Sequence, residues 1–352
     1  MNSKDINLYN NFNILRLLAA FQVVYRHTVE HLHIKNEMAL YISSIISYFP
    51  GVPIFFLISG YLITMSYEKN PDIKEYTKNR ALRIFPGLYV SFFVGLVILW
   101  YFGQFVGVNM IEIVPWIVAQ LSFFQFYNPE FIRNFGVGVI NGSLWTISVE
   151  LCFYIILPFL YMWLQKDFIK RVSMLLLISF GFYYYIQEIS ENTLIYEKLI
   201  RSSILPYLFY FLFGMAMYKY KEKLLKYIED KVLLFLGLYI LMSMIHTDLF
   251  LYDVVKQVVF SIFIFSFIFS YRSLSNKIVG NNDFTYGVYI YHMLIVNVMV
   301  EKGISGGVQN LMIVLVLSLA CGILSYFLVE KPFLKMKKRS LFGQMHRDDS
   351  DK

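Results

Sequence analysis

Apolar stretches long enough to cross a membrane recur from one end of the chain to the other, separated by polar segments. A transmembrane helix needs about 17 to 25 mostly apolar residues, and only helices and closed barrels satisfy their backbone groups in lipid. The pattern predicts an all-α polytopic membrane protein with about ten transmembrane helices. The expected spans are residues 12–31, 44–67, 84–103, 143–164, 172–187, 202–218, 232–246, 254–271, 284–301 and 308–329.

A further apolar piece, residues 111–126, is shorter and contains Pro115. We expect a short re-entrant or interfacial segment there, because a proline interrupts a helix and the run is short for a span. The spans fill nearly the whole chain. We therefore expect one transmembrane domain over residues 1–335, followed by a basic and polar cytoplasmic tail over residues 336–352.

The composition agrees with a membrane protein. Hydrophobic residues make up 58% of the chain and charged residues 16%, against about 25% charged residues in soluble domains. The first apolar run contains Arg16 and Arg26 and is followed by no small-residue cleavage site, so we expect a retained first span. Cys152 and Cys321 lie in apolar runs and indicate neither a disulfide framework nor a metal cluster. We expect no bound metal.

The basic residues predict an orientation. With the N-terminus inside, 23 of the 31 Lys and Arg residues fall in cytoplasmic segments, five fall outside and three fall within spans. Basic residues concentrate on the cytoplasmic side of membrane proteins, so this bias places both termini in the cytoplasm. Lys-rich loops facing anionic membrane lipids also account for the net charge of +7 without a nucleic-acid partner.

Two polar residues stand out in the first expected span. Arg16 and His27 are eleven positions apart, which is about 20° more than three helical turns, so they share one face of a helix, ~16 Å apart along its axis. An arginine at the centre of a membrane helix costs about 2.5–3.5 kcal/mol on insertion scales. The pair indicates a polar pathway that is entered from one side of the membrane.

Glu150 lies within the fourth expected span, which runs from outside to inside. It should be ~10 Å below the outer surface, and His27 about 8 Å below it. Because the two depths agree, a carboxylate–imidazole pair is expected, in which the carboxylate orients the ring and raises its basicity. The alternative is a structural ion pair between Glu150 and a nearby arginine.

Three further motifs carry polar or small residues. Arg80 and Arg83, at the end of the first long cytoplasmic loop, share a helical face and could bind phosphate bidentately or simply anchor the inner interface. Ser59 and Gly60 favour a close approach of two helices. His292, expected ~12 Å from the inner side, is compatible with an entry channel or with a packed, hydrogen-bonded histidine.

Taken together, these runs resemble the membrane acyltransferase-3 family. They occur in family order over nearly the whole chain. The features that carry the resemblance are Arg16 with His27, the run from Phe55 to Ile63, Arg80-Ala-Leu-Arg83, the run from Trp145 to Glu150, the Tyr289/His292 run and Glu330-Lys331-Pro332.

The resemblance implies transfer of an acetyl group from cytoplasmic acetyl-CoA to a hydroxyl of a cell-surface polysaccharide or its lipid-linked precursor, in the bacterial cytoplasmic membrane. It implies His27 as the key catalytic residue, as general base or acyl carrier, with Glu150 stabilising the imidazolium. Arg16, Arg80 and Arg83 would hold the CoA phosphates, and we also assign His292 to the donor site. Acceptor contacts are expected in the outer loops, chiefly residues 104–141.

Two other functions stay open at this point. A transporter or flippase for an acyl donor or a glycan would use the buried charges as pathway residues. An acyltransferase acting on a small molecule or a membrane lipid would carry the same motifs. The arginine pair favours an enzyme over a flippase, because a flippase has no need of a CoA site.

Overall fold

The computed structural model describes residues 10–188, 199–245, 247, 249–271, 274–280 and 282–336. These residues form helices and connecting loops, without a β-strand among them. Most of the expected tail, residues 337–352, and His246 at the end of one expected span lie outside the described residues. The stretches that are long and apolar enough to cross a membrane are Glu37–Lys69, Ile73–Tyr101, Gly142–Leu164, Leu199–Lys219, Phe250–Phe269 and Val308–Met336, and the shorter apolar helices are Met110–Leu121 and Val232–Met244.

The chain is thus an all-helical, polytopic membrane protein, as the hydrophobic pattern predicts. Within the described residues, six long apolar stretches and two shorter ones establish this class. The finer predictions, ten spans with both termini in the cytoplasm, stay predictions.

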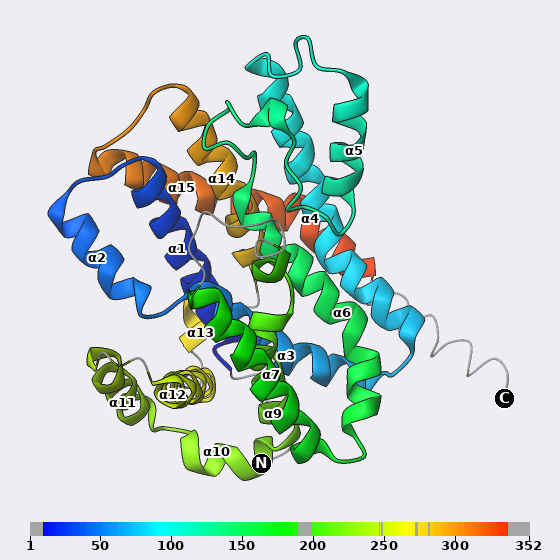
Figure 1. Cartoon of the computed structure of the whole chain (residues 1–352), viewed down its shortest axis with the longest axis vertical. Coiled ribbons are helices and arrows are strands. Elements are labelled where there is room, and N and C mark those ends of the chain that lie inside the picture. The colour runs from blue at the N-terminus through cyan, green and yellow to red at the C-terminus, as the bar shows by residue number, and fades with distance from the viewer. Residues whose placement is uncertain are drawn as a thin grey trace, which may run out of the picture. The chain divides into compact units, whose positions relative to one another are not determined.

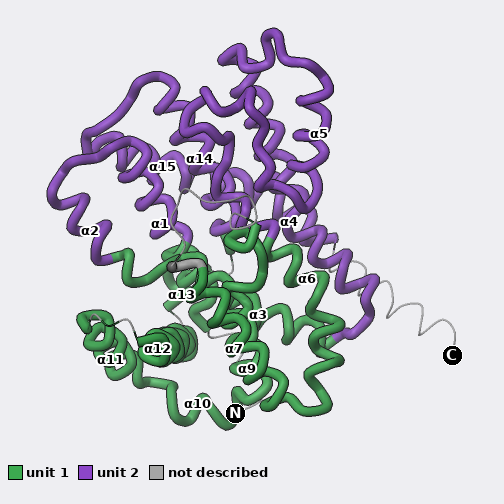
Figure 2. The backbone as a smooth tube through the Cα atoms, in the orientation of Figure 1, with its two compact units in different colours: residues 1–19, 46–69, 149–283 green, residues 20–45, 70–148, 284–352 purple. Residues whose placement is uncertain are grey.

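The helices fall into two compact units, each assembled from separate parts of the chain (Figure 2). Unit 1 comprises residues 1–19, 46–69 and 149–283, and unit 2 comprises residues 20–45, 70–148 and 284–352. Helices α1 (Phe12–His31) and α6 (Trp145–Leu164) each begin in one unit and end in the other.

Unit 1 holds the helices from α7 to α13, together with one early helix (Figure 1). They are α3 (Gly51–Lys69), α7 (Phe168–Glu188), the 3₁₀ turn η3 (Leu205–Tyr207), α9 (Leu208–Lys219), α10 (Lys221–Ile228), α11 (Val232–Met244), α12 (Phe250–Phe269) and α13 (Leu274–Ile278).

Helices α3 and α9 pack at nearly the closest distance two helices allow. A Cβ built on Gly60 would lie 2.1 Å from the backbone oxygen of Phe211, and one on Gly214 would lie 2.2 Å from that of Leu57. Only glycine fits where two backbones touch in this way. The close helix approach predicted at Ser59 and Gly60 is confirmed.

Unit 2 is built around the C-terminal helices and α4 (Figure 1). Its elements are α2 (Glu37–Ser47), α4 (Ile73–Tyr101), α5 (Met110–Leu121), the 3₁₀ turns η1 (Glu130–Ile132) and η2 (Gly142–Leu144), α14 (Thr285–Glu301), α15 (Val308–Ser325) and the π-helical turn η4 (Tyr326–Glu330).

Within unit 2, α14 contacts both α15 and α4. A Cβ on Gly287 would lie 2.7 Å from the Cα atom of Gly322, so α14 and α15 meet through glycines. On the other side, a Cβ on Gly87 of α4 would lie 2.7 Å from the Tyr286 ring. The Tyr286 hydroxyl donates a hydrogen bond of 2.9 Å to the carbonyl of Ile84. Small residues on one helix thus admit bulky residues of the next.

The first expected span matches α1 at both ends, but the second does not form one helix. Residues 44–67 were expected to be continuous, whereas α2 ends at Ser47 and α3 begins at Gly51. Pro50 explains the break, because proline lacks the N–H group that a helix requires and restricts the residue before it.

The third expected span begins too late. Residues 84–103 were predicted, but α4 begins at Ile73 and is 29 residues long, or ~43 Å. Asp72 caps its N-terminus, accepting a hydrogen bond of 2.6 Å from the N–H of Glu75. Arg80 and Arg83 therefore lie on the helix itself and not in a loop. Pro86 lies inside α4 without ending it.

The remaining boundaries shift by a few residues. Turns η2 and η3 precede α6 and α9, so these helices begin at Trp145 and Leu208. The apolar piece expected at residues 111–126 forms α5, a 12-residue helix over Met110–Leu121 that contains Pro115 in its interior. Because proline has no N–H group, the hydrogen bond to the preceding turn is missing at this position.

Candidate active site

The centre of the candidate site in unit 2 is a pair of histidines. The Nδ1 atom of His27, on α1, lies 3.0 Å from the Nε2 atom of His292, on α14. The two rings are close to parallel, with an interplanar angle of 25° and 5.2 Å between centroids. His292 is fully buried and His27 is half-buried. The pair joins α1 to α14.

A backbone carbonyl sets the protonation pattern of this pair. The Nδ1 atom of His292 lies 2.6 Å from the carbonyl oxygen of Tyr289. A carbonyl only accepts hydrogen bonds, so His292 must donate from Nδ1, and in the neutral ring its Nε2 is then an acceptor. His27 donates to that acceptor from Nδ1, which leaves the Nε2 of His27 unprotonated. A nitrogen with a free lone pair is what a general base requires.

The start of α6 fixes α14 beside this pair. The hydroxyl of Tyr289 lies 2.8 Å from that of Thr146 and donates to the carbonyl of Ser143 at 3.2 Å. Asn141 donates to the carbonyl of Ile290 at 2.7 Å and accepts from the hydroxyl of Ser143 at 2.6 Å. The motif that begins at Trp145 thus positions Tyr289, whose carbonyl orients His292.

Residues 136–140, part of the expected outer loop, are also attached to α14. Asn297 is fully buried. Its amide group donates to the carbonyls of Val139 and Ile140 at 3.0 Å each and accepts from the N–H of Val137 at 2.8 Å. Glu301 accepts from the N–H of Gly136 at 2.9 Å. These bonds hold residues 136–140, which belong to the region expected to contact the acceptor.

Glu150 lies in unit 1, on α6, and has two hydroxyl partners there. It accepts hydrogen bonds from Ser59 at 3.1 Å and from Tyr154 at 2.5 Å. These partners are neutral, in contrast to the arginine of the alternative that the sequence left open. His27 belongs to unit 2, and the pairing of Glu150 with His27 stays a prediction.

Arg16, in the part of α1 that belongs to unit 1, forms an ion pair with Asp283. The Nη1 and Oδ2 atoms are 3.0 Å apart, and both side chains are largely buried. The sequence analysis did not single out Asp283. A lone carboxylate one residue before an expected span was the available signal, since a buried arginine needs a partner. Binding of a donor phosphate by Arg16 stays a prediction.

Arg80 and Arg83 lie three residues apart on α4, and both are half-buried. The guanidinium of Arg80 lies over the ring of Tyr76, 5.9 Å from its centroid. Arg80 and Arg83 share a helical face, as predicted, because both lie within α4 and are three positions apart. Within unit 2, Ile84 directly follows Arg83 and accepts the hydrogen bond from Tyr286 of α14.

The position of His292 corrects the sequence analysis. Counting helical rise predicts that His292 lies ~12 Å from the inner side, deeper toward the cytoplasm than His27. The structure brings the two rings into hydrogen-bond contact. The count failed because it assumes that each helix begins at the membrane surface and runs perpendicular to it, whereas helices tilt and start at different depths.

Among the described residues, no group of three or more His, Cys, Asp and Glu side chains is arranged to hold a metal ion.

The described residues thus combine helices long and apolar enough to span a membrane with a pair of contacting histidines, a residue type that acid–base catalysis often uses. Comparison with known protein families identifies the family to which the chain belongs. Residues 9–330 match the family described as an acyltransferase domain. The chain belongs to this acyltransferase-3 family, whose members are membrane O-acyltransferases.

Individual relatives agree with this assignment. The chain is 28% identical to nodulation protein 10 of Rhizobium leguminosarum bv. viciae, over 93% of this chain and 94% of the relative. It is 29% identical to an O-acetyl transferase of Shigella phage Sf6, over 92% and 96% of the two chains. It is 32% identical to the peptidoglycan O-acetyltransferase OatA of Listeria monocytogenes, over 38% of this chain and 22% of that one. No solved structure matches the chain significantly.

The resemblance stated from the motifs is therefore confirmed, and the protein is an enzyme, an O-acetyltransferase by its family and its relatives. This result supports the enzyme over the transporter or flippase that the sequence left open.

Proposed function

We propose that this protein transfers an acetyl group from cytoplasmic acetyl-CoA to a hydroxyl of a cell-surface polysaccharide or its lipid-linked precursor, in a bacterial cytoplasmic membrane. The observation that carries the proposal is the chain of contacts from His27 through His292 to the carbonyl of Tyr289. The names of two relatives, an O-acetyl transferase and a peptidoglycan O-acetyltransferase, support acetyl as the group and a glycan as the acceptor.

In the proposed step, the Nε2 atom of His27 takes the proton of the acceptor hydroxyl as that oxygen attacks the thioester carbon. The C–O bond forms, the C–S bond breaks, and the proton passes from His27 to the departing thiolate. General bases of this kind contribute typically about 10²–10⁴-fold to the rate. The hydrogen bond from His27 to His292 keeps the basic nitrogen turned away from His292 and stabilises the imidazolium.

The donor site is proposed on α4. Arg80 and Arg83 carry permanent charges that suit the phosphates of CoA. Two observations in unit 2 support a donor extending from there toward the histidines. Tyr286 contacts α4 at Ile84, next to Arg83, and His292 follows Tyr286 by six residues, or ~9 Å along α14.

Two residues of unit 1 are assigned individually. We propose that Arg16 contributes to binding the donor phosphates and that Glu150 stabilises the positive charge that develops on His27. The proposed topology has ten spans with both termini in the cytoplasm, which follows from the 23 basic residues on that side. Acetyl-CoA is cytoplasmic, and the acceptor reaches the site from the outer side.

The test replaces His27 by Ala in cells that carry no other copy of the gene. Mass spectrometry of surface glycans should show loss of one acetyl mass per modified site, with the protein level in the membrane unchanged. The matched control is His33→Asn, because His33 is exposed and has a φ of 50°, which Asn tolerates. Full acetylation in the His27→Ala strain would refute the proposal.

The choice between direct transfer and an acyl-enzyme needs a second measurement. Purified protein is incubated with acetyl-CoA labelled in the acetyl group, without acceptor, and then denatured. Direct transfer predicts no label on the protein, since His27 only moves a proton. Label that disappears in His27→Ala would instead show that His27 carries the acyl group.

A further inference from the structure

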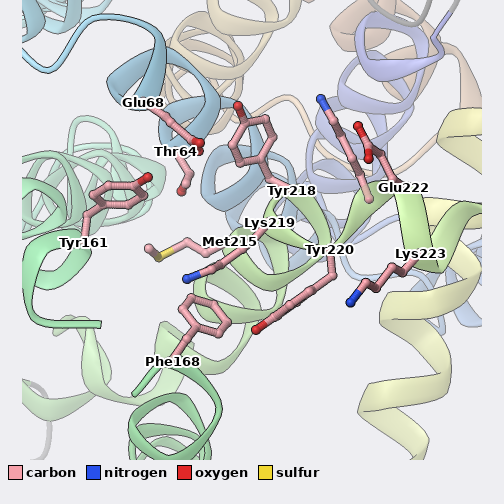
Figure 3. Close-up of a pocket in the computed structure, with 11 residues that line it drawn as sticks. Thr64, Glu68, Tyr161, Phe168, Met215, Tyr218, Lys219, Tyr220, Glu222 and Lys223 are labelled. Atoms are coloured by element: carbon pink, nitrogen blue, oxygen red, sulfur yellow. The ribbon is translucent and has the colours of Figure 1, made fainter. Parts of the chain in front are cut away.

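Unit 1 contains a pocket of about 340 Å³ at the C-terminal ends of α3 and α9, where α7 and α10 begin (Figure 3). We propose that this pocket binds the phosphate headgroup of an anionic phospholipid. The proposal does not rest on acyl transfer, and none of the residues assigned to the transfer site lines the pocket.

Three lysines on one short segment supply the positive charge. Lys219 ends α9, and Lys221 and Lys223 lie in the first turn of α10. In the described part of the chain, none of the three forms an ion pair with a carboxylate. Helix α10 also begins without a side-chain cap, so its positive dipole end adds to the charge of the lysines.

Aromatic rings contact two of these lysines. The ammonium of Lys219 lies 4.1 Å from the centroid of the Phe168 ring, and that of Lys221 lies 5.1 Å from the centroid of the Tyr218 ring. Phe168 in turn packs edge-on against Tyr220, at 5.6 Å between centroids. A cation on an aromatic face keeps its N–H groups available for an oxygen ligand.

The pocket also contains two carboxylates, Glu68 and Glu222. Glu68 interacts electrostatically with the hydroxyls of Tyr161 and Tyr218, and Figure 3 shows it on α3 near Tyr218. The negative charge of Glu68 is thus partly balanced by these neutral hydroxyl groups. Three ammonium groups against two carboxylates leave the pocket positive, which favours a phosphodiester over a cation.

The surroundings favour a lipid over a soluble phosphate compound. Apolar side chains next to the lining residues are exposed, namely Phe159, Met162, Trp163 and Ile169. Arg171 stacks on Trp163 with its guanidinium 4.7 Å from the ring centroid. Tryptophan and arginine together are typical of the membrane–water interface. Basic pockets at the cytoplasmic ends of membrane helices bind anionic headgroups, and the basic-residue bias predicts that this side is cytoplasmic.

The experiment titrates the purified full-length protein with dioctanoyl phosphatidylglycerol, dioctanoyl phosphatidylcholine, inorganic phosphate and coenzyme A, and counts adducts by native mass spectrometry. The test variant is Lys219→Gln/Lys221→Gln/Lys223→Gln. The matched control, Lys74→Gln/Lys78→Gln/Lys277→Gln, removes the same charge from exposed lysines that do not line the pocket. A second variant replaces the three pocket lysines by Arg and keeps the charge.

We expect the wild type to bind phosphatidylglycerol in preference to phosphatidylcholine. The Gln test variant should bind phosphatidylglycerol at least tenfold more weakly, while the control and the Arg variant bind it as the wild type does. Equal binding of the two lipids, or unchanged binding by a folded Gln variant, overturns the proposal. The proposal is also overturned if the Gln test variant loses binding of inorganic phosphate or coenzyme A but still binds the lipid. The ligand of the pocket is then a soluble compound.

Discussion

The Nδ1 atom of His27 is 3.0 Å from the Nε2 atom of His292, although the residues are 265 positions apart in the chain. Because His292 donates its own Nδ1 proton to the carbonyl of Tyr289, His292 can only accept from His27. A buried backbone carbonyl thus selects which nitrogen of His27 is basic. This relationship makes His292 a positioning residue for the proposed base.

Replacing His292 tests this role. His292→Ala should lower kcat about tenfold to a hundredfold, the effect of losing one orienting hydrogen bond of about 1–3 kcal/mol. His292→Gln should recover much of the activity, because its side-chain oxygen can take the place of Nε2 as the acceptor. Steady-state kinetics on reconstituted protein measure both. A purely packing role predicts that Leu would restore activity better than Gln.

The charge of Glu150 can be separated from its hydrogen bonds. In Glu150→Gln, the side-chain oxygen still accepts from Ser59 and Tyr154, so the thermal stability should change little. We expect kcat to fall by more than tenfold, because the amide carries no charge to stabilise an imidazolium. Activity within twofold of the wild type would show that Glu150 is a structural acceptor only.

The ion pair between Arg16 and Asp283 gives a third prediction. Arg16→Gln should raise the KM for acetyl-CoA and also lower stability, because it leaves a buried carboxylate unpaired. The swapped variant, Arg16→Asp/Asp283→Arg, should restore the level of protein in the membrane but not the KM. Recovery of both would mean that Arg16 serves only the ion pair.

The contact between α3 and α9 predicts a steric effect on stability. Gly60→Ala or Gly214→Ala should lower Tm strongly, because the added Cβ would lie within 2.2 Å of a backbone oxygen on the neighbouring helix. Gly181→Ala and Gly237→Ala are the controls, since nothing lies within 4 Å of a Cβ built there. Both lie in helices, where alanine is more favourable than glycine by about 1 kcal/mol. Unfolding in detergent, followed by circular dichroism, should give lower Tm values for Gly60→Ala and Gly214→Ala than for Gly181→Ala and Gly237→Ala.

The outer-loop attachment predicts an effect on the acceptor. Asn297→Leu removes the bonds to Val137, Val139 and Ile140 and leaves buried backbone groups without partners, at a cost of about 1–3 kcal/mol for each such group. We expect a lower Tm and a raised KM for the acceptor, with the KM for acetyl-CoA nearly unchanged. Asn310→Ala is the control, because this half-buried residue at the start of α15 donates to the carbonyls of Ser305 and Gly306 and not to residues 136–140. A rise in both KM values would argue that the loop does not contact the acceptor.

Several features of this protein follow from the sequence alone. Apolar runs specify membrane helices because an unpaired backbone group in lipid is costly, which is a local requirement. The bounds of the first helix, Phe12–His31, were predicted to the residue. The order of short motifs identified the family. The break at Pro50 and the cap at Asp72 were readable from local chemistry, since proline ends helices and aspartate begins them, but the long apolar runs obscured them.

Other features needed the tertiary structure. The pairing of His27 with His292 and that of Arg16 with Asp283 each join residues more than 260 positions apart. Such contacts depend on the tilt, depth and neighbours of whole helices, which helical periodicity does not contain. The sequence determined which side chains enter the membrane. The packing of the helices decided which of them meet, because burying a polar group in lipid is favourable only beside a partner.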